Sequence, residues 1–145
     1  MLKTSFLLIA LTITLSFLGC NSKKSTLRTT KVGSELLYQY QWNLTRLKHK
    51  NVIDTNIKLS FFPGKVSSVS GNTGCNNFRG TFELSETNNI KFSALATTKM
   101  ACLGKNYEAE FLQMMEEANQ WEIDNDQLIL KRDHKILAKF KSQQP

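Results

Sequence analysis

The sequence predicts an α+β domain in which an antiparallel β-sheet is covered by one amphipathic helix. Two observations predict this class. Most segments after Tyr40 alternate apolar and polar side chains, as strands with one buried face do, and turn residues such as Pro63-Gly64 and Asn125-Asp126 separate them. A single segment, residues 107–118, repeats its apolar side chains at helical spacing instead.

The predicted strands follow one another along the chain. Apolar side chains alternate in residues 42–47, 57–62, 78–84, 90–92, 121–123, 128–130 and 136–140. Between the second and third of these segments, Val66 and Val69 depart from the period of two, which suggests a β-bulge. Because many of the connecting segments are short and rich in turn residues, we expect consecutive antiparallel hairpins.

The predicted helix has one apolar face and one acidic face. The apolar side chains fall at i, i+4, i+7, i+8 and i+11, and they are Tyr107, Phe111, Met114, Met115 and Ala118. Glutamates at positions 108, 110, 116 and 117 occupy the other face. We expect the apolar stripe to belong to the core rather than to a ligand surface, with the helix covering one mouth or face of a curled sheet.

Residues 1–19 have the features of a secretory signal peptide. Lys3 supplies a positive charge, and a mostly apolar run of about 13 residues follows, which is too short to span a bilayer. The ending Gly19-Cys20 resembles the lipobox of bacterial lipoproteins, although the two residues before Gly19 depart from the usual pattern. The resemblance implies that Cys20 becomes the mature N-terminus and carries acyl chains such as palmitate, which hold the protein on a membrane.

The rest of the chain divides into a tether and one domain. Residues 20–37 are expected to form the lipidated N-terminus and a polar tether, because most of this segment is polar, basic and without periodicity. Residues 38–141 are then the folded domain. We expect it to be lipid-anchored in a bacterial cell envelope, facing the periplasm.

The charge balance is basic. The chain has 19 Lys and Arg against 12 Asp and Glu, a net charge of +7. Such a balance suits an anionic membrane surface, an acidic partner or nucleic acid. Because the basic residues are scattered and form no Lys/Arg-rich block, we do not expect nucleic-acid binding.

Two local patterns stand out. Residues 71–80 read Gly-Asn-Thr-Gly-Cys-Asn-Asn-Phe-Arg-Gly, and residues 96–102 read Ala-Thr-Thr-Lys-Met-Ala-Cys. The glycines at 71, 74 and 80 allow backbone angles that other residues avoid, and the asparagines can bond to loop backbone. No Gly-Lys-Ser/Thr follows, so this is not a phosphate loop. The pattern favours a structural loop, with a ligand site as the alternative.

Together these patterns resemble the META domain, also called HslJ-like. The signature is G-x-x-G-C-N-x-[FY]-x-G followed by T-[RK]-M-A-C before a helix; here its residues are Gly71, Gly74, Asn76, Phe78, Gly80, Thr98 and Met100. The resemblance covers residues 38–141 and implies a curled, barrel-like antiparallel sheet with a packed helix. The family occurs in bacterial envelope proteins linked to stress response or antibiotic tolerance, and no enzymatic activity is established for it.

Cys75 and Cys102 are the cysteines that remain after Cys20. In an exported protein, two remaining thiols predict a disulfide bond. Free buried thiols are the alternative. A metal site lacks ligands, because His49 and His134 are isolated and no Cys-x-x-Cys occurs. No nucleophile motif is present either, so we expect neither catalysis nor a cofactor.

The function that follows is non-catalytic. We expect a membrane-anchored envelope lipoprotein that acts in envelope stress or antibiotic tolerance by binding an unknown protein or lipid partner. The alternative is a lipid- or peptide-binding module that uses the concavity of the sheet.

Overall fold

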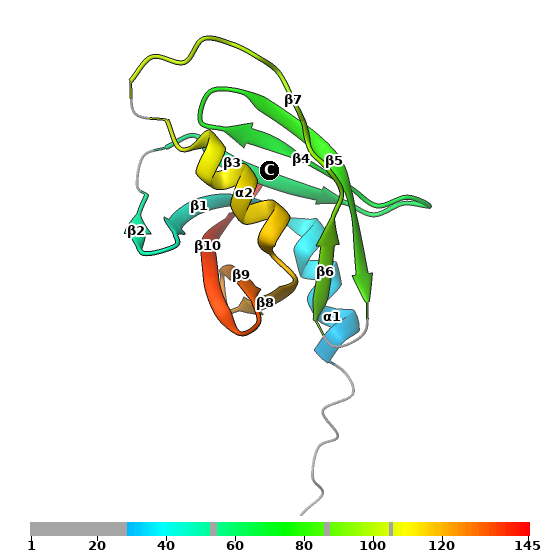
Figure 1. Cartoon of the computed structure of the whole chain (residues 1–145). Coiled ribbons are helices and arrows are strands. Elements are labelled where there is room, and N and C mark those ends of the chain that lie inside the picture. The colour runs from blue at the N-terminus through cyan, green and yellow to red at the C-terminus, as the bar shows by residue number, and fades with distance from the viewer. Residues whose placement is uncertain (1–28, 53–54, 86–87, 105) are drawn as a thin grey trace, which may run out of the picture.

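The computed structural model describes residues 29–52, 55–85, 88–104 and 106–145, and its centre is a closed antiparallel β-barrel of eight strands (Figure 1). The strand order is β10-β9-β8-β6-β5-β4-β3-β1, and β10 pairs with β1 to close the ring. The barrel strands are β1 (Gln41–Leu47), β3 (Ile57–Phe62), β4 (Ser68–Thr73), β5 (Asn77–Ser85), β6 (Asn89–Phe92), β8 (Gln120–Asp124), β9 (Gln127–Arg132) and β10 (Lys135–Gln143).

Four further elements complete the domain. The two-residue strand β2 (Lys50–Asn51) pairs with β1, and β7 (Ala96–Thr97) pairs with β5. The helices are α1 (Thr29–Gln39) and α2 (Glu108–Glu117). The predicted fold class is confirmed, and the barrel that the family resemblance implied is present.

The alternating patterns place apolar side chains inside the barrel as predicted. In β3, Ile57, Leu59 and Phe61 are buried. Inward-facing side chains of neighbouring strands pack against them. The ring centroids of Phe61 and Phe82 are 5.0 Å apart, and the rings are nearly edge to face. The largest fully buried side chains include Trp42, Phe61, Phe111, Phe140, Met114 and Met115. The barrel described here is therefore filled by its own side chains.

The predicted bulge between residues 65 and 70 is wrong. Strands β3 and β4 pair without a register shift, and Val66 is 69% exposed in the loop between them. The register shifts lie instead where β10 pairs with its neighbours, between Ile136 and Ala138 on the β9 side, and in β1 between Leu44 and Arg46. A bulge lets consecutive residues face inward, which explains why Leu137 and Ala138 are both buried.

The predicted helix is confirmed as α2. Phe111, Met114 and Met115 are fully buried, and the ring of Phe111 lies 5.4 Å from that of Phe78 on β5. Figure 1 shows α2 lying across the barrel rather than beside it. The apolar stripe is therefore part of the core, as expected.

The second helix, α1, corrects the prediction of a single helix and of a tether that extends to residue 37. Its apolar side chains are too few to show a period in the sequence, but tertiary contacts hold it. Leu37 is fully buried, and its carbonyl accepts a hydrogen bond from Nε1 of Trp42 at 3.0 Å. Gly33 lies so close to the ring of Trp121 that an added Cβ would be 3.3 Å from it. No helix in the described part of the chain is long and apolar enough to cross a membrane.

Candidate functional site

The two motifs that stood out in the sequence meet around the side chain of Asn76. This residue ends the turn between β4 and β5 and is only 3% exposed. Its Oδ1 accepts hydrogen bonds from Oγ1 of Thr98 at 2.8 Å and from the backbone N–H of Met100 at 2.7 Å, while its Nδ2 donates to Sγ of Cys102 at 3.5 Å. A buried carboxamide without partners would be costly, so these contacts fix the second motif against the first.

Thr73 connects the same turn to the start of α2. Its hydroxyl is buried, donates to Oε2 of Glu108 at 2.5 Å and accepts from the backbone N–H of Asn76 at 3.1 Å. Oδ1 of Asn106 accepts from the backbone N–H of Glu108 at 2.8 Å and so satisfies a free donor at the helix start. The roles of Thr73 and Asn106 were not predicted from the sequence. For Asn106 a signal was present, because an Asn just before an acidic first turn is typical of a helix start.

A disulfide bond joins Cys75 and Cys102, with their Cα atoms 5.9 Å apart. The predicted pairing is therefore present in the structure. We call Thr73, Cys75, Asn76, Thr98, Met100 and Cys102 the Asn76 cluster. In it, one covalent bond and several hydrogen bonds hold residues 98–102 to the β4–β5 turn.

The motif glycines serve two different purposes. Gly74 has φ +98°, a left-handed conformation that favours glycine, as predicted. Gly71 and Gly80 do not share this conformation, so the predicted reason is wrong for them. Gly71 is needed because backbone approaches closely: a Cβ there would lie 1.9 Å from the carbonyl oxygen of Lys58. A Cβ on Gly80 would lie 2.5 Å from Cδ2 of Leu95, so the side chain of Leu95 would have to move. Phe78, between them, is in the core.

The segment held by the Asn76 cluster exposes two large apolar side chains. Met100 is 61% exposed and Leu103 is 99% exposed. We call residues 99–104 the stapled loop. The backbone N–H of Met100 is bound by Asn76, and Cys102 lies next to Leu103 in the chain, so the fold fixes this backbone without using either side chain in its core. These side chains are available for contact with another molecule.

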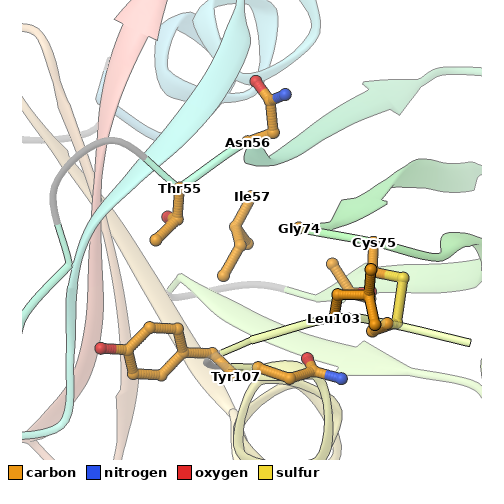
Figure 2. Close-up of a pocket in the computed structure, with 10 residues that line it drawn as sticks. Thr55, Asn56, Ile57, Gly74, Cys75, Leu103 and Tyr107 are labelled. Atoms are coloured by element: carbon orange, nitrogen blue, oxygen red, sulfur yellow. A yellow bond between two sulfur atoms is a disulfide. The ribbon is translucent and has the colours of Figure 1, made fainter.

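A cavity of about 260 Å³ lies beside the disulfide (Figure 2). Its lining includes Ile57, Asn56, Leu103 and Tyr107, together with the disulfide, and Figure 2 shows Tyr107 and Cys75 at two sides of it. Pockets for drug-sized ligands measure roughly 300–1,000 Å³. The cavity therefore suits one side chain of a partner or a very small ligand.

The remaining candidate residues lie apart from this site. His49 and His134 are exposed, in or next to turns at the ends of hairpins. Within the described ranges, no three His, Cys, Asp or Glu side chains are grouped so that they could hold a metal ion. Cys20 lies outside the described residues.

The disulfide predicts that the domain is sensitive to reductant. It closes a loop with a sequence separation of 27 residues. The chain-entropy model gives such a loop about 3.5 kcal/mol of stabilisation, so dithiothreitol should lower the denaturation midpoint of the purified protein markedly. The Cys75→Ser, Cys102→Ser double variant should be less stable and should not respond to reductant. Two free thiols counted at these positions in denatured, unreduced protein from the envelope would contradict the bond.

Comparisons with known proteins place this architecture in a family. A protein solved by NMR superposes with a TM-score of 0.58 at 27% identity, covering 74% of this chain and 92% of the other. A second NMR structure, of a protein from Burkholderia xenovorans, gives 0.61 at 20% identity, with 76% and 86% covered. The crystal structure of a DUF4847 family protein from Bacteroides vulgatus gives 0.54 at 14% identity, with 77% and 98% covered. The last two likenesses concern the fold alone.

A comparison with curated proteins finds none that matches this chain. The family model described as META domain matches residues 34–144, which contain the whole barrel, the Asn76 cluster and α2. The match begins within α1, four residues before the predicted start of the domain at residue 38. It ends three residues after the predicted end at residue 141. The resemblance drawn from the two motifs is thus confirmed, and the chain belongs to the META domain family.

Proposed function

We propose that this protein is an envelope lipoprotein, anchored through Cys20, whose META domain binds a partner protein through the stapled loop. The observation that carries the proposal is that loop itself: a disulfide and a buried carboxamide hold Met100 and Leu103 where their side chains meet solvent. The proposed role in envelope stress or antibiotic tolerance follows from the family resemblance.

The disulfide supports the export step. Disulfide bonds persist in oxidising compartments such as the periplasm and are rare in the cytosol. A chain that begins with a charged residue, an apolar run and Gly19-Cys20 would reach such a compartment. The bond between Cys75 and Cys102 and the N-terminal pattern thus agree on the destination.

The place of the stapled loop in the domain is compatible with a partner away from the anchor. The chain enters the domain at α1, and Figure 1 shows the start of α1 at the lower end of the view and the stapled loop at the upper end. A membrane that holds Cys20 would then lie on the α1 side. The stapled loop would face away from that membrane, toward other envelope proteins.

The alternative function, a lipid or peptide held in the concavity of the sheet, has less support. Trp42, Phe61, Phe111 and Phe140 occupy the inside of the barrel, and each is at most 1% exposed. A ligand of lipid size would have to displace several of these side chains. We therefore favour binding at the outer surface.

The anchor is tested by metabolic labelling with an alkyne fatty acid. The wild-type protein should take up label and sediment with membranes, whereas Cys20→Ala should lose the label and appear as soluble or unprocessed protein. The Cys75→Ser, Cys102→Ser variant keeps Cys20 and should still be labelled. Persistent labelling of Cys20→Ala would show that the acyl chain is attached elsewhere or that the lipobox interpretation is wrong.

The binding surface is tested by site-specific photo-crosslinking in cells. A benzoylphenylalanine in place of Leu103, in the full acylated protein, should give a discrete protein adduct. The same probe in place of Lys135, which is exposed at the start of β10, is the matched control and should give none. No adduct at position 103, or the same adducts from both positions, would overturn the assignment of the stapled loop.

A further inference from the structure

A second surface feature lies on the outer face of the sheet, next to the stapled loop. It is an open groove of about 590 Å³ that crosses β3, β4, β5 and β7. We call it the basic groove, and it is defined by Lys58, Ser70, Asn72, Asn77, Arg79 and Thr98.

The charges of the groove are of one sign. Lys58 and Arg79 line it, and among the residues that the structure describes no Asp or Glu does. Among the described residues, the ion pairs use other cations, namely Lys50, Lys131, Arg132 and Lys141. A concave surface with two cations and no carboxylate attracts an anionic partner.

The strand register sets the distance between the two cations. Lys58 is opposite Asn72, and Asn72 is opposite Asn77 on the next strand. Arg79 is two residues further along that strand, opposite Ser70. Two strand spacings and one two-residue step place the Cα atoms of Lys58 and Arg79 roughly 12 Å apart.

The groove also carries amide and hydroxyl groups that hydrogen bonds hold in place, between apolar parts of its lining. Nδ2 of Asn72 donates to Oδ1 of Asn77 at 3.0 Å, and Oδ1 of Asn72 accepts from the backbone N–H of Gly74 at 2.7 Å. The backbone carbonyl of Asn77 accepts from the backbone N–H of Thr98 at 3.0 Å, and the backbone N–H of Asn77 donates to Oγ1 of Thr98 at 3.1 Å. The groove is therefore fixed to the start of the segment that presents Met100.

We propose that the basic groove binds an acidic, extended segment of the partner protein. Carboxylates four residues apart on one face of an extended chain are about 13 Å apart, which matches the spacing of the two cations. Side-chain amides and hydroxyls in the groove can donate to and accept from a peptide backbone. The groove also borders the stapled loop, so one partner chain can contact both. The inference rests on the proposed function and adds the chemistry of the partner.

The test measures binding of a fluorescein-labelled peptide of alternating Glu and Ala to the full-length protein in neutral detergent, by fluorescence anisotropy. The peptide should bind, binding should weaken with salt, and a Gln-for-Glu peptide should not bind. The Lys58→Gln, Arg79→Gln variant should bind about tenfold or more weakly, because charge pairs across an interface add specificity. The control Arg132→Gln, Lys135→Gln removes the same two charge types on the β9–β10 hairpin and should bind within about twofold of the wild type.

Three outcomes would overturn the inference. Equal losses in both double variants would mean that net charge alone attracts the peptide. In the second outcome, inorganic pyrophosphate binds as tightly as the peptide, or phosphatidylglycerol vesicles do so while phosphatidylcholine vesicles do not. This binding is lost in the groove variant. That result would assign the groove to phosphate groups. The third is an unchanged adduct from position 103 in the groove variant, which would leave the proposed function standing and reject the groove. If the peptide binds in the groove but position 103 gives no adduct, the groove assignment stands and the proposed function of the stapled loop is rejected.

Discussion

The side chain of Asn76 is the interaction on which the arrangement of the candidate site depends. It is buried, and a buried carboxamide must have its hydrogen bonds made. Two of its partners, Thr98 and the backbone of Met100, belong to a segment more than 20 residues away in the chain. Without Asn76 the segment from Thr98 to Cys102 would be held by its bonds to Asn77, by the pairing of β7 with β5 and by the disulfide, and the N–H of Met100 would lose its partner. The covalent bond limits how far that segment can move, whereas the carboxamide specifies where its backbone lies.

The barrel supplies the rigid frame for this interaction. Eight strands close into a ring, although β6 and β8 pair at only one position, and the interior is filled by aromatic and aliphatic side chains. Helix α2 packs Phe111 against Phe78, near the start of β5, and Glu108 bonds to Thr73 at the end of β4. The turn is therefore held from the core side by packing and from the solvent side by the disulfide. Loop residues positioned by such a scaffold are common carriers of binding functions.

The sequence was informative where a local pattern determines structure. Alternation located seven of the eight barrel strands, and the spacing from Tyr107 to Ala118 located α2, because burial on one face imposes these periods. It did not locate β4 (Ser68–Thr73), whose last three residues, Gly71-Asn72-Thr73, were interpreted as the start of a loop. The cysteine pair also followed from residue type, and Asn76 was identified only as one of several motif residues. Helix α1 was missed, because Leu37 and Gly33 owe their positions to tertiary contacts with Trp42 and Trp121. The bulge was misplaced, because the register of β10 depends on two partner strands that are distant in sequence. The basic groove could not be predicted either, because Lys58 and Arg79 come together only through the pairing of three strands.

The central claim is that the carboxamide of Asn76 fixes the stapled loop. Native-state hydrogen exchange at the backbone N–H of Met100 tests it most directly, because this group bonds to Oδ1 of Asn76. In the disulfide-bonded wild type, the N–H should be protected relative to an unstructured peptide. In Asn76→Ala that protection should fall by about tenfold or more, the loss expected for one hydrogen bond to a buried acceptor, while the amides of β9 and β10 stay protected. Exchange of the Met100 N–H at the unstructured rate in the wild type, or unchanged protection in Asn76→Ala, would contradict the account.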